Sequence, residues 1–341
     1  MFKFVGAILV LAVGSALAAT TCEGAELYSK STVKYGRWEV RMKAAATPGS
    51  VSSFFTYNNN SYLGTPNPWR EIDIEVLGNK PNAFQSNIIS GTAEDKTTSE
   101  DVHNVTGLAS NFHTYTLDWT PDSVVWRMDG VVQRKTAAPD QQVLDMRDSA
   151  QTWRMNLWAS NSTGWVGKLD LTKLPVYQVV NWMRYSSYTP GKGDNGSNFT
   201  FSWLDDFDKF DTQRWAKGDW TFDGNLAQLT TVNIAAKSGY LVLALTTPEA
   251  DGVSGVIPKD PAGDTYGTAS VRGTARDLPL RAIGTSNGIR IEGAQPGFEI
   301  AVRNANGQIL TQVDGSVSEI PLAARGVMFV QAGSRSIAVV R

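Results

Sequence analysis

The stretch at residues 69–76 reads Trp-Arg-Glu-Ile-Asp-Ile-Glu-Val, and its acidic and apolar residues alternate from position 71 onward. In a β-strand, successive side chains point to opposite faces of the sheet. The pattern therefore predicts a strand that carries Glu71, Asp73 and Glu75 on one face and aliphatic side chains on the other. The aliphatic face can pack into a core while the carboxylates stand on an open face.

Three neighbouring carboxylates repel one another and raise at least one pKa, so a functional site explains the triplet better than an exposed acidic strand does. Two carboxylates that flank a glycosidic bond are the usual equipment for sugar hydrolysis, and retaining enzymes hold them about 5–5.5 Å apart. On a flat strand the Cα atoms of Glu71 and Glu75 would lie about 13 Å apart. We therefore expect the strand to curve so that its open face is concave.

Three nearby segments also place polar and aromatic side chains at every second position. They are Phe55, Tyr57 and Asn59; Gln85 and Asn87; and Arg154, Asn156 and Trp158. Each series alone is as typical of ordinary sheet surface as of a site. Together with the carboxylates they predict a sugar-binding cleft, because sugar rings stack on aromatic faces and hydroxyls bind amides and charged groups.

The remaining sequence up to about residue 247 is dominated by short strand patterns. Residues 36–43, 114–119 and 124–130 alternate, Asp129-Gly130 is a hairpin turn signal, and residues 240–245 read as a buried strand. Helical periodicity is nearly absent. Many short strands over this length predict a β-sandwich of two sheets.

The composition excludes several classes of protein. Of 341 residues, 42% are hydrophobic and 19% are charged, and the net charge is −2, which excludes a disordered chain and argues against a nucleic-acid partner. A single cysteine, Cys22, excludes a disulfide framework and is expected to be an unpaired thiol. The two histidines, His103 and His113, are too few for most histidine-dependent metal sites.

Tryptophan is the unusual component of the chain. All 11 tryptophans lie between Trp38 and Trp220. The family resemblance described below assigns one group to the cleft or its wall, namely Trp69, Trp158, Trp165, Trp203 and Trp220. The other group, expected in the sandwich core, comprises Trp38, Trp119, Trp126, Trp153, Trp182 and Trp215.

The N-terminus has the pattern of a secretory signal peptide at residues 1–18. Lys3 supplies the positive charge, residues 5–13 form a short apolar run, and Ala16-Leu17-Ala18 is a cleavage pattern. A buried N-terminal helix is the alternative. No other segment is long and apolar enough to cross a membrane, so we expect a secreted, extracellular protein.

The chain divides into parts by composition. A Gly-rich loop at residues 190–197 interrupts the Trp-rich part, and a Pro- and Gly-containing stretch at 258–264 marks its end. We expect a catalytic β-sandwich at 19–257, a linker at 258–285 and a small all-β domain at 286–341.

The motif from Trp69 to Glu75 resembles the signature of family-sixteen glycoside hydrolases, which are retaining endoglycanases with a jelly-roll, concanavalin-like β-sandwich. Its spacing, without an inserted residue before the last Glu, is similar to that of the lichenase branch rather than the laminarinase branch. Further segments similar to the family are 24–28, 35–36, 51–55, 84–87, 112–115 and 119–121. The segment 207–245 precedes the others in most members but comes last here, which resembles circularly permuted members. The likeness covers about residues 24–257.

The resemblance implies roles for individual residues. Glu71 would be the nucleophile, Glu75 the general acid/base and Asp73 the assisting carboxylate. The residues that would line or support the cleft are Phe55, Tyr57, Asn59, Trp69, Gln85, Asn87, Glu100, Arg154, Asn156, Trp158, Trp165, Trp203 and Trp220. Tyr62 and Lys96 stand where similar members have Glu and Gln, which leaves the fine specificity open.

The resemblance also implies a structural Ca²⁺ on the convex side, bound at Asn181, Asp206 and Gly239 largely through backbone carbonyls, which suit a hard cation. Catalysis itself would need no cofactor. The C-terminal segment at about 266–341 resembles the sorting or surface-attachment tails of secreted proteins, which would bind secretion or cell-surface machinery. A carbohydrate-binding module is the rival interpretation, although aromatic platforms are scarce there (Tyr266, Phe298 and Phe329).

The function expected from these features is endo-hydrolysis of mixed-linkage 1,3-1,4-β-D-glucan with retention of configuration. One alternative keeps the fold but changes the polymer, for example to laminarin or xyloglucan. A second alternative is a lectin-like sandwich without catalysis, against which the intact carboxylate triplet argues.

Overall fold

The computed structural model describes residues 21–261, 265–266, 270–271, 281–292, 299–306, 308–314, 317–332 and 335–340. The predicted signal peptide at 1–18 lies outside the described residues, as does most of the predicted linker. Among the described residues, no helix combines the length and the apolar character that a membrane span requires.

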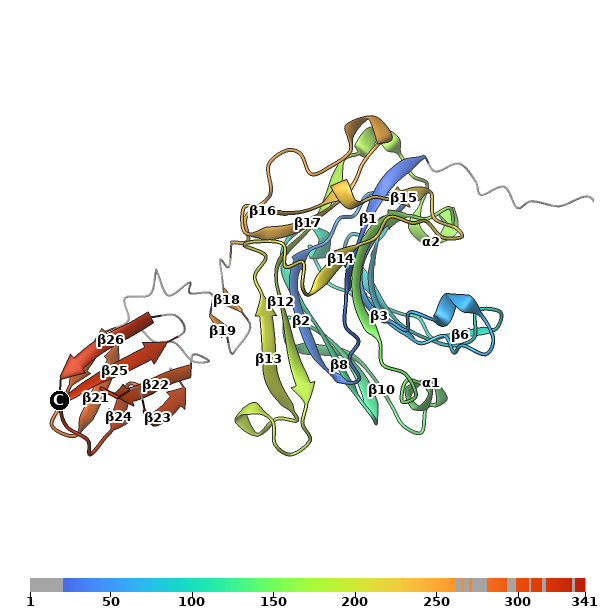
Figure 1. Cartoon of the computed structure of the whole chain (residues 1–341). Helices are drawn as coiled ribbons and strands as arrows, with labels where there is room; N and C mark the ends of the chain where they lie inside the picture. Colours follow the sequence, from blue (N-terminus) through green and yellow to red (C-terminus); the bar gives the residue numbers. More distant parts are fainter. Residues whose placement is uncertain are drawn as a thin grey trace, which may run out of the picture.

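The first sheet of the large unit has nine strands, of which Figure 1 labels β1, β3, β6, β14 and β15. The acidic motif lies on β4, between β3 and β5. The strand order of the sheet is β14-β1-β11-β3-β4-β5-β6, with β15 paired to β1 and β7 paired to β5. The bounds are β1 (Cys22–Ser29), β3 (Ser50–Tyr57), β4 (Glu71–Leu77), β5 (Ala83–Gly91), β6 (Lys96–Thr98), β7 (Asp101–Asn104), β11 (Thr152–Ala159), β14 (Trp215–Lys217) and β15 (Ala227–Leu229).

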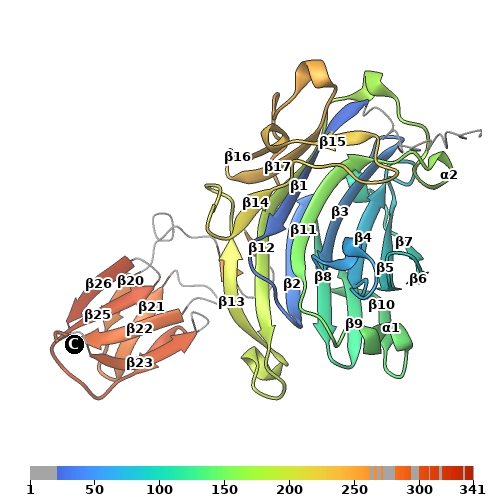
Figure 2. The same ribbon diagram turned by 45° about the vertical axis from the view of Figure 1, so that its right-hand side comes forward.

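The second sheet has eight strands in the order β10-β9-β8-β2-β12-β17-β16, with β13 paired to β12. Its strands are β2 (Gly36–Lys43), β8 (His113–Thr120), β9 (Ser123–Met128), β10 (Val131–Ala137), β12 (Val176–Tyr188), β13 (Phe199–Asp205), β16 (Ile234–Lys237) and β17 (Tyr240–Leu245). Figure 2 shows the two sheets packed face to face. The predicted all-β sandwich is confirmed, and the late strands β14 to β17 complete both sheets. The circular permutation stays a prediction.

Helices are few and short in the described part of the chain. The α-helices are α1 (Gln141–Asp145) and α2 (Thr163–Val166), and the 3₁₀ turns are η1 (Ser61–Leu63), η2 (Leu108–Ser110), η3 (Leu171–Lys173), η4 (Asp194–Gly196), η5 (Thr231–Asn233) and η6 (Pro248–Ala250). Two of them matter for the site, because η1 carries Tyr62 and α2 carries Trp165.

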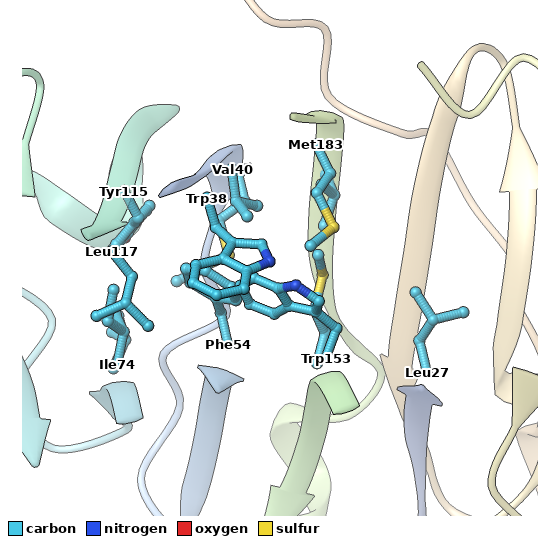
Figure 3. Packing of buried hydrophobic residues seen from close by; sticks show 14 of the residues in the cluster. Leu27, Trp38, Val40, Phe54, Ile74, Tyr115, Leu117, Trp153 and Met183 are labelled. Atoms are coloured by element: carbon cyan, nitrogen blue, oxygen red, sulfur yellow. The ribbon is translucent and has the colours of Figure 1, made fainter. Parts of the chain in front are cut away.

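The core between the sheets is built on tryptophan. Trp38 of β2 meets Trp153 of β11 edge-to-face, with ring centroids 4.6 Å apart, and Trp153 stacks on Phe54 at 4.5 Å (Figure 3). Aromatic pairs of this kind add about 0.5–1.5 kcal/mol each beyond the area that they bury. The six tryptophans predicted for the core are all fully buried: Trp38, Trp119, Trp126, Trp153, Trp182 and Trp215.

Strand β4 has the two faces that its sequence predicts. Ile72, Ile74 and Val76 are 0% exposed and belong to the core cluster. The three carboxylates alternate with them and therefore occupy the opposite face of the sheet. This division holds the acidic face in place, because turning β4 over would expose the aliphatic side chains to water.

The sandwich retains the chain slightly beyond the predicted boundary at residue 257. Asp260, whose side chain is 0% exposed, accepts two hydrogen bonds from Arg41, at 2.7 and 2.9 Å, and one from Asn181 at 3.0 Å. The paired charges explain why this burial is tolerated. Pro258 to Asp260 therefore belong to the sandwich and not to the linker.

The C-terminal segment forms separate sheets with their own core. One sheet contains β20 (Arg281–Gly284), β21 (Gly288–Glu292) and β24 (Glu319–Pro321), and the other contains β22 (Glu299–Asn304), β23 (Ile309–Asp314), β25 (Val327–Ala332) and β26 (Arg335–Val340). The core side chains are Ile289, Ile291, Ile300, Val302, Ile320, Met328, Val330 and Val339. The predicted small all-β unit is thus present, and the first of its described strands, β20, lies inside the predicted linker. The predicted linker also contains the short pair β18 (Thr265–Tyr266) and β19 (Ser270–Val271).

Candidate active site

The register of the first sheet aligns functional side chains in two rows across the strands. One row runs Asn87, Asp73, Phe55, Arg154 and Tyr28, and the other runs Gln85, Glu75, Ser53, Asn156 and Glu26. Residues directly opposite one another in antiparallel strands share a face and lie about 4.5–5.5 Å apart at Cβ. Each row therefore carries polar groups from β5 through β1 past one carboxylate of β4.

These rows form the floor of a cleft of about 680 Å³. The residues that line it are Glu26, Tyr28, Ser53, Phe55, Tyr57, Asn59, Tyr62, Trp69, Glu71, Asp73, Glu75, Arg154, Asn156, Trp158, Trp220, Thr221 and Phe222. All three carboxylates of the motif face this one cavity, which is lined by aromatic rings and amides as sugars require.

Glu71 is held by donors at the edge of the triplet. The indole Nε1 of Trp69 donates a hydrogen bond of 2.7 Å to its Oε2. Burial raises the pKa of Glu71 to about 7, while the Trp69 bond and the charges of Lys96 and Arg154 act in the opposite direction. The Trp69 donor and the two cations therefore offset part of the cost that burial imposes on the ionised form of Glu71, which is the form that a nucleophilic carboxylate requires.

Glu75 lies in surroundings that favour its protonated form. Burial raises its pKa to about 8, and the negative charges of Glu71 and Glu100 add to the effect. Its Oε2 accepts a hydrogen bond of 3.2 Å from the amide of Gln85, whose own oxygen accepts one of 3.2 Å from Nε1 of Trp165. A carboxyl group that keeps its proton near neutral pH can serve as a general acid.

Asp73 stands between the two glutamates and is tied to both sheets. Burial and the flanking charges of Glu71 and Glu75 raise its pKa well above the ordinary value, and it shares a hydrogen bond with Glu71. Its backbone carbonyl accepts a hydrogen bond of 2.9 Å from Nε1 of Trp126, which reaches across the core from β9. The Asp73 side chain is thus hydrogen-bonded to Glu71, and its backbone is held by Trp126 of the opposite sheet.

The far side of the floor is held by a buried ion pair. Arg154 of β11 binds Glu26 of β1, and it also donates a hydrogen bond of 2.8 Å to Asn59. Burial raises the pKa of Glu26, and the Arg154 charge opposes that effect. The Arg154 guanidinium lies 4.9 Å from the ring centroid of Tyr57 and 5.8 Å from that of Trp220. The pair therefore positions the aromatic wall of the cleft.

Most of the residues expected at the cleft are brought together there. Phe55, Tyr57, Asn59, Trp69, Arg154, Asn156, Trp158 and Trp220 line it with the three carboxylates. Gln85 and Trp165 reach it through the bond to Glu75. Asn87 lies opposite Asp73 and accepts a bond of 2.9 Å from the Ser99 N–H, and exposed Glu100 acts on Glu75 by its charge.

Trp203 requires a correction, because the structure places it on β13 in the second sheet. It packs against Tyr185 and Trp215 at 5.7 and 5.9 Å, and the Arg214 guanidinium lies 4.0 Å from its ring centroid. A tryptophan in an alternating strand has the same local pattern in either sheet, so the sequence could not separate Trp203 from Trp220.

The sequence analysis missed several residues of the cleft. Glu26 and Tyr28 come from β1, Ser53 from β3, and Thr221 and Phe222 follow Trp220. Tyr62 of η1, which the sequence analysis named only for its effect on specificity, also lines the cleft. The alternation of Glu26 and Tyr28 was an available signal. Their position beside Arg154 and Asn156 depends on how β1 and β11 pair, and that pairing has no local signature.

The residues predicted to bind calcium lie in the second sheet, away from the cleft. The pairing of Val180 with Leu241 brings Asn181 of β12 beside the turn at Gly239, and the pairing of Met183 with Asp205 brings Asp206 toward the same strand. Their oxygen donors fit a hard cation. Among the described residues no group of three or more His, Cys, Asp and Glu could hold a metal.

The raised pKa values predict that stability falls as pH rises. The unfolded chain releases the Glu75 proton near its ordinary pKa of 4.5, whereas the folded chain holds that proton up to about pH 8. Folding is therefore linked to proton uptake between these values. We expect Glu75→Gln to be more stable than wild type at pH 8 by more than about 1 kcal/mol, and the difference to vanish near pH 4.5.

Urea unfolding of both proteins across this pH range measures the effect. Glu249→Gln is the matched control, because Glu249 is exposed on η6. If the free energies of unfolding of Glu75→Gln and wild type differ by the same amount at every pH, the proton linkage is contradicted.

Comparison with known proteins gives the chain a family. The family model described as glycosyl hydrolases family 16 matches residues 9–173. The β-glucanase of Fibrobacter succinogenes is 49% identical over 258 residues, which cover 73% of each chain. The β-glucanase of Bacillus amyloliquefaciens is 39% identical over 160 residues, which cover 46% of this chain and 61% of that one.

A solved structure of the Bacillus licheniformis β-glucanase is also similar. It is 34% identical over 47% of this chain and 70% of its own, with a TM-score of 0.40. The identity to the Fibrobacter protein extends over most of both chains, and the family model's match at residues 9–173 includes the strand that carries the three carboxylates. The chain belongs to family 16 of the glycosyl hydrolases.

Proposed function

We propose that the chain is a secreted endo-1,3-1,4-β-D-glucanase that hydrolyses mixed-linkage β-glucan with retention of configuration. The observation that carries the proposal is the carboxylate row of β4. Glu71 receives an indole N–H and faces two cations, whereas Glu75 faces other carboxylates. The neighbours of Glu71 lower its pKa against the effect of burial, whereas the neighbours of Glu75 raise its pKa further, and this difference assigns Glu71 as nucleophile and Glu75 as acid.

In the first step, Glu71 attacks the anomeric carbon while Glu75 donates its proton to the oxygen of the leaving chain. This step produces a covalent glycosyl-enzyme on Glu71. In the second step, Glu75 removes a proton from water, which attacks the anomeric carbon and releases Glu71. Asp73 holds the nucleophile through their shared hydrogen bond.

Retention is supported by how close the two glutamates are. They project from the same face of one strand, and the charge of Glu71 raises the pKa of Glu75 directly. Inverting enzymes separate their carboxyl groups by about 6.5–9.5 Å to admit water, whereas retaining enzymes hold them about 5–5.5 Å apart. The Asp73 bridge to Glu71 fits the shorter separation.

A β-glucan substrate is supported by the relatives and by the cleft. The similar proteins of Fibrobacter succinogenes and Bacillus amyloliquefaciens are β-glucanases. The cleft offers Trp69, Trp158 and Trp220 as stacking surfaces and Asn59 and Asn156 as partners for hydroxyl groups. The uninterrupted spacing of the three acids favours mixed-linkage glucan over laminarin. The buried, charge-coupled triplet argues against a lectin-like module without catalysis.

The proposal predicts that Glu71→Ala loses the hydrolysis of lichenan. Without the nucleophile no glycosyl-enzyme can form, so reducing-sugar release should fall below about a thousandth of the wild-type rate. Glu249→Ala, a substitution on the exposed η6, should keep the wild-type rate. Residual activity of Glu71→Ala above that level would remove the role assigned to Glu71.

The same assay separates the alternatives. Lichenan should be hydrolysed in preference to laminarin, xyloglucan and carboxymethylcellulose, and NMR should show the β-anomer as the first product. If the α-anomer appears first, the enzyme inverts the configuration and the proposed retaining mechanism is wrong. Faster hydrolysis of laminarin or xyloglucan would make that polymer the substrate instead of mixed-linkage glucan. If no reducing sugar is released from any of the polymers, a binding module without catalysis is favoured.

We also propose a structural calcium ion at Asn181, Asp206 and Gly239. The support is the convergence of these residues around the middle of β12 and their oxygen donors. A bound ion would stabilise the folded state alone. Calcium should therefore raise the Tm of wild type but not that of Asp206→Ala, whereas the rate on lichenan at 25 °C should be unaffected. An equal rise in both proteins would place the ion elsewhere.

Export and surface attachment complete the proposal. The charged start, apolar run and Ala16-Leu17-Ala18 pattern support cleavage after residue 18. The C-terminal β unit, with a core of its own, suits a sorting or attachment domain. Mass spectrometry of the protein from medium and cell surface should find a mature N-terminus at Ala19. An intact Met1 in that fraction would refute the signal peptide.

A further inference from the structure

A chain of three side chains leads from solvent to Glu71. Lys96 begins the edge strand β6 and is exposed, and its ammonium lies 3.4 Å from the centroid of the Trp69 ring. Trp69 in turn donates its indole N–H to Glu71 Oε2 at 2.7 Å. The charge of Lys96 therefore lies on the face of the ring whose edge holds the candidate nucleophile.

A cation over an aromatic face is attracted by the negative charge density of that face. It withdraws electron density from the indole, so the N–H at the ring edge becomes more positive and a stronger donor. A stronger donor favours the ionised carboxylate over the neutral carboxyl group. The Lys96 charge also attracts the Glu71 carboxylate directly through space.

We propose that Lys96 is a positioning residue that, through Trp69, keeps the nucleophile Glu71 ionised and sets the lowest pH at which the enzyme works. The inference rests on the proposed function. It gives a role to a position that departs from the family pattern and that lies outside the lining of the cleft.

The charges around Glu71 single out Lys96. The groups that face Glu71 are Asp73 and Glu75 of its own strand, Tyr57 of β3, Arg154 of β11 and Lys96 of β6, with Glu100 beyond β6 acting on the other two acids. Arg154 is largely neutralised by its ion pair with Glu26. Lys96 forms no ion pair in the described part of the chain, so its charge on Glu71 is not compensated within the protein.

The influence of Lys96 is also selective. Its charge lowers the pKa of Glu71, whereas the charges that act on Glu75 are those of Glu71 and Glu100. Activity requires an ionised Glu71 and a protonated Glu75. The acid limb of the pH profile of kcat/KM therefore reports the ionisation of Glu71, and the basic limb reports that of Glu75. Loss of Lys96 should therefore move the acid limb alone.

The test is the pH profile of kcat/KM on lichenan for Lys96→Met, which removes the charge but keeps an apolar stem over Trp69. The acid limb should move to higher pH by about 0.5 unit, and the basic limb should stay. Lys96→Arg should restore the wild-type profile. Lys80→Met, at an exposed lysine in the turn between β4 and β5, is the matched control and should leave both limbs in place.

Salt supplies a second readout. Because Lys96 is exposed, 1 M NaCl should screen its charge and bring the wild-type acid limb close to that of Lys96→Met. A merely structural role of the side chain would not respond to salt in this way.

Two results would overturn the inference. An acid limb of Lys96→Met that coincides with that of wild type would remove the electrostatic role. A rise in KM by the same factor at every pH, with unmoved limbs, would make Lys96 a sugar contact instead.

A readout without substrate separates this inference from the proposed function. In protein labelled with ¹³C at the glutamate carboxyl groups, the signal that Glu71→Gln lacks reports the titration of Glu71. Its midpoint should rise in Lys96→Met even if no polymer is hydrolysed, in which case the proposed function fails and the inference stands. An unchanged midpoint in an active enzyme overturns the inference alone.

Discussion

The mutual repulsion of three carboxyl groups on one face of β4 is the constraint on which the rest of the structure depends. Burial raises the pKa of Glu71, Asp73 and Glu75, and the charge of Glu71 raises the pKa of Asp73 and Glu75 further, which destabilises the folded chain above the ordinary pKa of a carboxyl group. The aliphatic face of the same strand, with Ile74 at its centre, offsets this cost by complete burial. The strand keeps its acidic face toward the cleft because the opposite orientation would lose that burial.

An indole N–H group supports each of the three acids, either directly or through one neighbouring side chain. Trp126 donates to the backbone of Asp73 from the second sheet, Trp69 donates to Glu71, and Trp165 orients the Gln85 amide that binds Glu75. Indole combines a large apolar surface with a single donor, so it can exclude water and still satisfy one oxygen. The tryptophan-rich composition therefore serves both the core and the carboxylate row, and not only the stacking of sugars.

Particular residues show where prediction from the sequence succeeds and where it fails. The two faces of β4 followed from local alternation and are confirmed, and the six tryptophans expected in the core are buried. Trp203 was assigned to the cleft from the family resemblance, and its strand pattern, which is the same in either sheet, could not correct that assignment. The ion pair of Asp260 with Arg41 joins residues that are far apart in the chain, and no local pattern predicts that the sandwich extends to Asp260.

The sequence by itself determined which residues share a strand face, which of them are apolar enough to be buried, and that three acids must stand together. These properties depend on the period of two along one strand, which is local. The tertiary structure alone decided that Glu26 and Tyr28 complete the cleft, that Trp220 and not Trp203 enters it, and that Lys96 lies on Trp69. Those contacts depend on the order and register of strands distant in sequence, which the packing of the whole core selects.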